Sequence, residues 1–526
     1  MSRLRLGKIS PQRSILGRRD AIAMIPANFL QFYPPPSVIS QAMLRNPLSK
    51  VLLLAATAYC GTTPGAETAG DSPAYLLESR RAVGDATKVT ISLEVGGDLI
   101  VTPEAGGESK LPMSVAAKLA YQEQIVDCGD DPSKPARSLR RYREANATIK
   151  TDQQGVERQL PLDRRMIVAE VTEDAAALNG LGYPLSREQF DLINVACNTI
   201  AIDRLLPGRE LPKGDGWDHD AATMACLLGM DHVAVCEVRS VVTGEENRQV
   251  QIRLAGTVHG TVDGAASEMD LRGAYLYHLD EGRITKLNVA IKEVRKVGEV
   301  SPGLDVVAKL SVVALPLEPG TAPFDGAILE QAREVSGPAL RQLLVDAPSR
   351  GYQFCHDSSW FVTAEHRERM SLRLMESGNL LAHCNLTSLP TRVATEPKGL
   401  GEFEKEVCDA LGAKVETVEA AREWTTANGN RCLGVFVNGA VEEAPIQWRY
   451  YHVSNDGGAQ ATIAVTVEQS LLERFADADR PIVDSLELID VPLETPAAEK
   501  PIETAEQVEP AEPAETAVLE IGATKK

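Results

Sequence analysis

Several segments of this chain alternate apolar and polar residues with a period of two, and this pattern restricts the fold more than any other feature. In QVQIRLAGTVHGTV, residues 249–262, the apolar positions include Val250, Ile252 and Leu254. ITKLNVAIKEVRKV, residues 284–297, alternates in the same way. Successive side chains of a strand point to opposite faces of a sheet, so this period predicts strands with one buried face.

Residues 76–317 are therefore predicted to form a mostly antiparallel β domain with short helices. The segment KVTISLEVGGDLIV alternates around Gly96 and Gly97, and a glycine pair between alternating runs predicts a hairpin turn. PLSREQFDLI is expected to be a short helix with Ser186 as its N-cap, and AATMACLLGM a second short helix.

A second domain is predicted over residues 328–490, because the Pro- and Gly-containing stretch 318–327 marks a boundary before it. Met370, Leu372 and Leu374 alternate along one strand, and a turn at Gly378 leads into a returning strand. LGEFEKEVCDALG is amphipathic and is expected to be a helix that ends at Gly412. DADRPIVDSLEL predicts a last helix.

Residues 1–58 have the features of a leader with a signal peptide. They hold eight Lys or Arg and a single acid. The segment from Met43 has a basic start, then the apolar run 51–56, then Ala56-Thr57-Ala58, which fits the rule for signal cleavage. We therefore expect Met43 to be the true start and residues 59–75 to be a linker. Cys60 raises the alternative of a lipid anchor, although the bulky Tyr59 before it disfavours that processing.

The predicted signal peptide places the mature protein in the periplasm or outside the cell. No later segment has the roughly 20 apolar residues that a membrane-spanning helix needs. Nine cysteines are present, and in an oxidising compartment they could form disulfides, with the pairing left open. Several lie on predicted apolar faces, where buried free thiols are the alternative. Residues 491–526 combine eight Glu with five Pro, which predicts a disordered acidic tail.

The length and the charge of the chain limit its organisation and its partners. A chain of 526 residues is too long for one core, so two or three domains are expected. The formal net charge of −20 disfavours binding to nucleic acid, which requires clustered Lys and Arg to displace counterions.

Part of the second domain resembles a known family. The segments that carry the resemblance are SSWFVTAEHRERMSLRLMESGNLLAHCNLTSLP, LGEFEKEVCDALG, IQWRYYHV and TVEQSLLERFADADRPIVDSLEL, within residues 350–488. Their order is similar to that of the PsbP/Mog-type α/β/α sandwich, as found in exported planctomycete-type bacterial proteins of no assigned activity. The resemblance implies a non-enzymatic subunit that serves in binding or assembly. It carries no catalytic set.

The motif GDGWDHD, residues 214–220, places three carboxylates around His219. Its spacing lacks the glycine and the distant glutamate of a calcium loop. We therefore interpret the motif as a turn in which Trp217 anchors the chain and Asp218 or Asp220 caps the following helix, with a weak cation site or a catalytic role as the alternatives.

Two Cys-His pairs suggest zinc, namely Cys355-His356 and His383-Cys384. Adjacent residues on a strand point to opposite faces, so neither pair easily offers both side chains to one metal. The chain also lacks the GxSxG, HExxH and phosphate-loop motifs. The sequence therefore names no catalytic, cofactor-binding or metal-binding residue, and whether the protein is an enzyme stays open, with a non-enzyme favoured.

Two further clusters have alternative interpretations. The four arginines at positions 137, 140, 141 and 143 are expected on a solvated helical face, with a site for an acidic partner as the alternative. Ile446, Trp448, Tyr450 and His452 alternate onto one face of a strand. Packing under a covering helix explains this pattern, and an exposed ligand or partner surface is the alternative.

Taken together, the sequence predicts an α+β protein of the bacterial envelope that is exported and that binds or assembles without catalysis. The alternatives are an envelope hydrolase with dispersed catalytic residues and a carrier of lipid or another apolar ligand. A large apolar cavity would favour the carrier. A cleft with a histidine, a carboxylate and a hydroxyl or thiol in contact would favour the hydrolase. The partner, an unknown protein or small ligand, and the oligomeric state are left open.

Overall fold

The computed structural model describes residues 73–102, 107–128, 136–172, 175–318, 320–366, 369–391, 397–441 and 443–489. The predicted leader 1–58, nearly all of the linker and the acidic tail 491–526 lie outside these residues. The described part is α+β, mostly antiparallel strands with a few short helices, which confirms the predicted fold class at this level.

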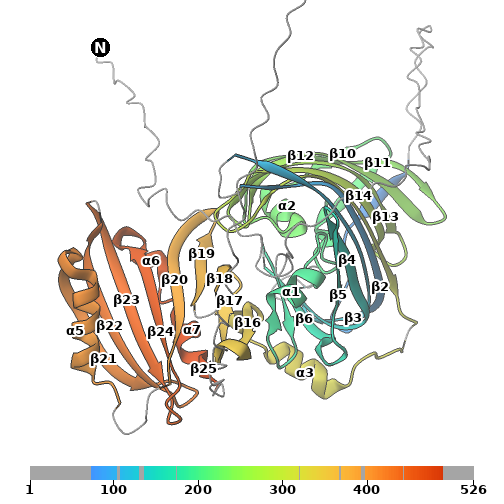
Figure 1. Ribbon diagram of the computed structural model, residues 1–526. Helices are drawn as coiled ribbons and strands as arrows, with labels where there is room; N and C mark the ends of the chain where they lie inside the picture. The colour runs from blue at the N-terminus through green and yellow to red at the C-terminus, as the bar shows by residue number, and fades with distance from the viewer. Residues whose placement is uncertain are drawn as a thin grey trace, which may run out of the picture.

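A curved twelve-stranded antiparallel sheet makes up the first part of the chain (Figure 1). Its strands, in spatial order, are β10 (Gly216–Asp218), β11 (His232–Glu246), β12 (Gln249–Val262), β13 (Ala265–His278), β14 (Arg283–Arg295), β15 (Gly303–Pro316), β2 (Ala86–Val101), β3 (Ser109–Asp127), β4 (Arg137–Thr151), β6 (Met166–Val171) and β7 (Ala176–Gly180). Strand β5 (Gln154–Gln159) pairs with β4, and β1 (Ala74–Leu77) pairs separately with β9 (Arg209–Pro212).

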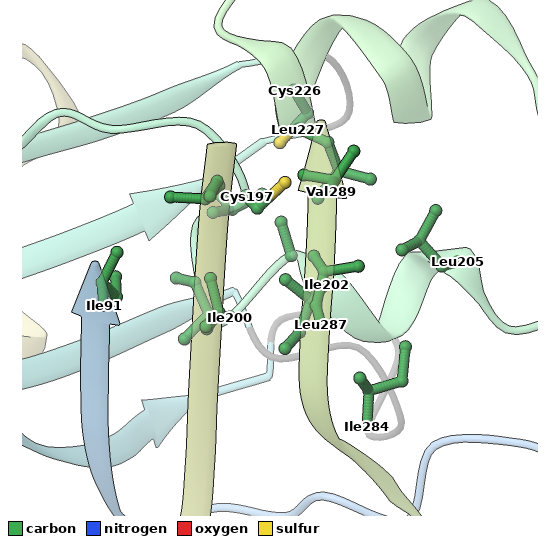
Figure 2. Close-up of a cluster of buried hydrophobic side chains, with 14 of the residues drawn as sticks. Ile91, Cys197, Ile200, Ile202, Leu205, Cys226, Leu227, Ile284, Leu287 and Val289 are labelled. Carbon is green, nitrogen blue, oxygen red and sulfur yellow. The ribbon is translucent and has the colours of Figure 1, made fainter. Parts of the chain in front are cut away.

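The concave side of this sheet is filled by the chain itself. Figure 1 shows the sheet curving around α1 (Arg187–Ile193) and α2 (Ala221–Leu228). In Figure 2, side chains of residues 197–205 and of α2 lie against Ile91 of β2 and Leu287 and Val289 of β14. These side chains belong to one large buried cluster, so the interior of the curve is a packed core.

Two glycines lie where neighbouring strands approach too closely for a side chain. At Gly97, φ is +150° and an added Cβ would lie 2.2 Å from the carbonyl oxygen of Asp305. At Gly256, φ is +152° and the Cβ would lie 2.0 Å from the carbonyl oxygen of Glu237. The hairpin predicted at Gly96-Gly97 is therefore wrong: β2 runs through both glycines without a turn. Gly97 permits close contact with β15 there, whereas a Cβ at Gly96 would have no atom within 4 Å.

Both short helices predicted in this part are confirmed, with their caps. Ser186 caps α1, where its side chain accepts a hydrogen bond from the backbone N–H of Gln189 and a capping box is complete. Asp220 caps α2, because its carboxylate accepts from the Thr223 N–H at 2.6 Å.

A small four-stranded sheet connects the two large sheets (Figure 1). Its order is β25 (Glu487–Leu488), β17 (Tyr352–Asp357), β16 (Gln342–Ala347) and β8 (Leu185–Ser186), and β8 pairs with β16 in parallel. Before it, α3 (Gly326–Glu334) and α4 (Gly337–Leu340) lie over the first sheet, where Phe324, Ala332 and Leu340 share a buried cluster with Val126 and Leu139.

The second large sheet has seven antiparallel strands. Their spatial order is β18 (Trp360–Glu365), β19 (Arg369–Glu376), β20 (Asn379–Leu389), β24 (Gln460–Glu468), β23 (Ala444–Ser454), β22 (Arg431–Val441) and β21 (Val415–Thr425). Helix α5 (Leu400–Leu411) buries Phe403 and Val407 against one face, and Gly412 ends it as predicted. On the other face, α6 (Leu472–Phe475) and α7 (Arg480–Ser485) pack with β17.

Short 3₁₀ turns complete the elements of the described chain. They are η2 (Leu162–Arg164), η3 (Ile202–Leu205), η4 (Pro348–Arg350), η5 (Gly412–Lys414) and η6 (Gln469–Leu471).

Candidate binding cleft

A cleft of 1410 Å³ lies where the concave side of the first sheet faces the small sheet and the near edge of the second. One wall comes from α1, residues 194–196 and 198, the C-terminal end of α2 and the turn between β12 and β13. The opposite wall comes from β16 to β20 and the segment around α6. Its volume exceeds the roughly 300–1,000 Å³ that is usual for small-molecule pockets.

The two walls are held together at the base of the cleft by Arg187 of α1. Its Nη2 donates to the carbonyl of Ser358 at 2.6 Å and to that of Trp360 at 3.1 Å. Its guanidinium also lies over the rings of Phe190 and Phe361. Because β8 directly precedes this residue and pairs with β16, Arg187 is fixed on both sides.

A second contact joins the walls at the turn between β12 and β13. The Cβ that Gly264 lacks would lie 2.2 Å from the terminal methyl of Met375, and that of Gly378 would lie 2.9 Å from Thr261. Nearby, the guanidinium of Arg373 donates to the carboxylate of Glu299 at 2.8 Å. The cleft is thus bounded by two separate points of contact between the sheets.

The lining of the cleft is predominantly acidic. Nine of its residues are Asp or Glu and five are Arg. Three of the arginines have their charge paired along the second wall, Arg341 with Asp357, Arg350 with Glu365, and Arg474 with Glu376. The other two arginines lie on the first wall, where Arg187 is 3.9 Å from Asp191 and Arg295 is 3.6 Å from Asp263, so the surplus of carboxylates over arginines is spread over both walls.

Asp191 and Asp231 are poised to change protonation near neutral pH. The side chain of Asp191 is 57% exposed, but it faces the cleft, whose walls replace much of the surrounding water. That loss of solvation raises its pKa to about 7, against the opposing effect of Arg187, and nearby Asp263 raises it further. Burial likewise raises the pKa of Asp231 to about 6, although its carboxylate accepts the Gly264 N–H.

His356 is the one histidine among the described residues that line the cleft. Its side chain is 2% exposed, and its Nδ1 lies 2.8 Å from the backbone carbonyl of Asp357. Burial lowers its pKa to about 4, so the ring is neutral at physiological pH. A catalytic pair would require a hydroxyl, thiol or carboxylate group hydrogen-bonded to this imidazole. No such hydrogen bond is found within the described part of the chain.

Behind the cleft floor, the first sheet contains a buried ionic network centred on Glu123 of β3. Its carboxylate contacts Nε of Arg140 at 2.8 Å and Nη2 of Arg81 at 3.3 Å. The hydroxyls of Ser138 and Thr199 donate to it as well. All five side chains are buried. Burial alone raises the pKa of Glu123, but the two guanidinium groups outweigh it and the pKa lies below its ordinary value.

The GDGWDHD motif lies away from the cleft and has a structural role. Trp217 Nε1 donates to the carbonyl of Leu205 at 2.9 Å, and Asp220 caps α2. His219 Nε2 lies 2.8 Å from Oγ of Ser240, which also accepts from Tyr275, and all three are buried. Burial lowers the pKa of His219 to about 4. The interpretation of this motif as a capped, anchored turn is therefore confirmed.

The two residues of each Cys-His pair differ in burial, as expected for neighbours on a strand. His356 of β17 and Cys384 of β20 are buried, whereas Cys355 and His383 are partly exposed. Within the described residues, no group of His, Cys, Asp and Glu is arranged to hold a metal ion. Likewise, no helix of the described chain is both long and apolar enough to cross a membrane.

The prediction for the four arginines was wrong. Residues 137–143 belong to strand β4, not to a helix. Arg140 is 2% exposed and pairs with Glu123, whereas Arg141 lies over the ring of Phe324. In so short and so polar a run, the period of two typical of a strand cannot be distinguished from the period of 3.6 typical of a helix. In addition, the carboxylate of Glu123 that pairs with the buried Arg140 lies on another strand.

The aromatic strand is confirmed as core packing. Ile446 and Trp448 of β23 are buried under α5, and His452 lies edge-on to Phe403 of that helix. On the opposite face, Arg449 and the hydroxyl of Tyr451 both contact Asp479.

The cleft residues escaped prediction because they come together only in the folded chain. Asp191, Asp231 and Asp263 are widely spaced, and no motif links them. Glu123 did carry a signal. It lies between Tyr121 and Ile125 on the inward face of β3, and a carboxylate in an apolar period-two series indicates a buried partner.

This chain has little similarity to known proteins. No family model matches this chain. No curated protein matches it either. Among solved structures, cyanobacterial PsbP from Synechocystis sp. PCC 6803 is 11% identical, covers 28% of this chain and 92% of its own, and has a TM-score of 0.24.

Two further solved structures cover more of this chain with still lower scores. The translocator domain of autotransporter NalP from Neisseria meningitidis is 7% identical over 74% of this chain and 90% of its own, with a TM-score of 0.11. OccK5 of Pseudomonas aeruginosa is 11% identical over 73% and 98%, also with a TM-score of 0.11. At such scores none of the three supports an assignment of fold or function.

Proposed function

We propose that this chain is a non-catalytic binding protein of the bacterial envelope that holds a basic peptide segment of a partner protein in the cleft between its two large sheets. The observation that carries the proposal is the acidic cleft itself, with nine carboxylate residues and five arginines over 1410 Å³. Clefts lined by one sign of charge concentrate the field and attract the opposite charge.

The size of the cleft and the placement of its charges favour an extended peptide over a small metabolite. The volume is larger than a typical small-molecule pocket. Asp191, Asp231 and Asp263 lie along one wall, where successive Lys or Arg side chains would meet them in competition with Arg187 and Arg295.

The alternatives have less support. A hydrolase would need a histidine with a hydroxyl or thiol in the cleft, and His356 bonds instead to its neighbour's carbonyl. A carrier of apolar ligands would use the concave side of the first sheet, which its own core side chains fill.

Export to the envelope rests on the sequence of residues 43–58. For the second sheet with its helices, we propose membership of the PsbP-like folds, on the order strand, hairpin, helix, meander and closing helix.

The proposal predicts that a labelled hexalysine peptide binds through the cleft carboxylates. Replacing both Asp191→Asn and Asp231→Asn should weaken binding by about tenfold or more, as the loss of two close opposite charges implies. Fluorescence anisotropy measures the dissociation constant. Asp270→Asn, on an exposed position of β13, is the matched control and should change it less than about twofold. Equal weakening by both variants would mean that the acidic surface as a whole, not the cleft, attracts the peptide.

Binding should also depend on pH in a defined direction. Asp191 and Asp231 have raised pKa values of about 7 and about 6, so both are largely protonated at pH 5 and ionised at pH 8. A lysine peptide stays charged throughout, so affinity should rise from about pH 5 to pH 8. Calorimetry in buffers of different ionisation enthalpy should detect proton release on binding near pH 6.5. The double Asn variant should lose most of both effects. A flat profile for the unmodified protein would exclude these two carboxylates as the binding groups.

A further inference from the structure

Two cysteines meet at the floor of the cleft. Cys197 lies in the segment between α1 and η3, and Cys226 lies in the last turn of α2. The backbone N–H of Cys197 donates to the carbonyl of Leu227 at 2.6 Å, so the two chain segments are adjacent. Figure 2 shows the two sulfur atoms pointing toward each other above Ile200 and Ile202. Both are thiols in the structure and both belong to the same buried cluster.

The backbone at this point is held in an unusual conformation. Cys197 has φ of +61°, in the left-handed region that residues other than glycine, asparagine and aspartate seldom adopt. Such strain persists only where the surroundings impose it, and it marks positions with a particular role. Here the backbone N–H of Cys197 donates to the carbonyl of Leu227, and the thiol is directed at α2.

Both thiols are buried, Cys226 at 4% and Cys197 at 5% exposure, but they differ in position. Cys226 is among the residues that line the cleft, whereas Cys197 is not. A small reagent that enters the cleft would therefore meet Cys226 first. This order is the one that two-step thiol–disulfide exchange requires.

We propose that Cys197 and Cys226 form a reversible disulfide that fastens residues 194–198 to α2 and fixes the floor of the cleft. The oxidant is a low-molecular-weight disulfide. The Cys226 thiolate attacks one of its sulfurs, forms a mixed disulfide and releases one thiol. The Cys197 thiolate then attacks the Cys226 sulfur and releases the second thiol. Two protein thiols lose two electrons and two protons, and the external disulfide is reduced to two thiols.

The burial of the pair predicts that this oxidation is slow. Burial raises the pKa of Cys197 to about 12, so its thiolate is scarce at neutral pH. Once formed, the bond would be shielded from external thiols for the same reason. The inference does not depend on what the cleft binds.

Peptide mapping of the full chain tests the proposal. The protein is incubated with oxidised glutathione at pH 8.5, its remaining thiols are alkylated, and it is digested with trypsin without reduction. A linked pair of the tryptic peptides 188–204 and 214–239 is expected, and reduction should abolish it. Because peptide 214–239 also contains Cys236, the experiment is run in parallel on Cys236→Ser, where the same linkage should persist.

Thermal unfolding gives the second measurement. The oxidised protein should unfold roughly 5 °C higher than the reduced protein, since the bond closes a loop within the core. Cys197→Ser and Cys226→Ser should each remove this difference. Cys384→Ser, at a cysteine buried elsewhere, is the matched control and should retain it. Alkylation of both Cys197 and Cys226 after prolonged oxidation, or a link from Cys226 to Cys236 instead, would overturn the proposal.

Discussion

Replacing Glu123→Gln is expected to lower the free energy of unfolding by about 3–5 kcal/mol, the cost of removing one partner from a buried ion pair. The carboxylate is fully buried and contacts the guanidinium groups of Arg81 and Arg140. Glutamine keeps the shape and some hydrogen bonds but leaves both cations in the core without their counter-charge. Urea unfolding followed by tryptophan fluorescence measures the change.

The pH dependence of stability gives an independent check on Glu123. Its folded pKa is lower than its ordinary value, so its ionised form stabilises the fold above the unfolded pKa, and that stability is lost as the pH falls through the folded pKa. Glu123→Gln should therefore lose part of the acid sensitivity. Glu268→Gln, at a side chain that is 68% exposed, is the control and should change stability by less than about 0.5 kcal/mol. If Glu123→Gln also changed the free energy of unfolding by less than about 0.5 kcal/mol, the buried ionic network would not be needed for stability.

The second large effect is expected at Gly256, where Gly256→Ala should destabilise the protein by about 3 kcal/mol or more. The added Cβ would lie 2.0 Å from the carbonyl oxygen of Glu237 and 2.5 Å from Cα of Val238. Both contacts are with backbone atoms, which cannot rotate away, and φ of +152° is unfavourable for alanine. Strands β11 and β12 would have to separate at this point. Thermal unfolding by circular dichroism measures the loss.

Gly244→Ala provides the matched control for this effect. Gly244 lies on β11, the partner strand, and an added Cβ there has no atom within 4 Å. Alanine at Gly244 should leave the melting temperature unchanged or slightly raised, because it restricts the unfolded chain without a clash. If both substitutions had the same effect, close strand contact would not explain the glycine at position 256.

The alternating segments show which structural features could be predicted from the local sequence. Val250, Ile252 and Leu254 are all buried on β12, and the caps at Ser186 and Asp220 were recognisable from residue type and position.

Two predictions failed because they depended on neighbouring strands. Gly96 and Gly97 have the composition of a turn, yet β2 passes straight through them. The backbone of the neighbouring strand β15 leaves no room for a Cβ at Gly97. Arg140 of β4 was expected to be solvated because its partner Glu123 lies on another strand, β3.

By itself, the sequence determined the strands within residues 249–262 and 284–297 and the short helices that follow Ser186 and Asp220. These properties depend on the period of apolar residues and on caps within a few positions, which are local. Only the tertiary structure decided the candidate site. Asp191, Asp231 and Cys226 lie on separate elements, and the curvature of one sheet together with the β8–β16 pairing brings them to one cleft. Cys197 reaches the neighbourhood of Cys226 only through its backbone contact with Leu227. Contacts between distant segments leave no trace in local pattern, so the site appears only once the chain is folded.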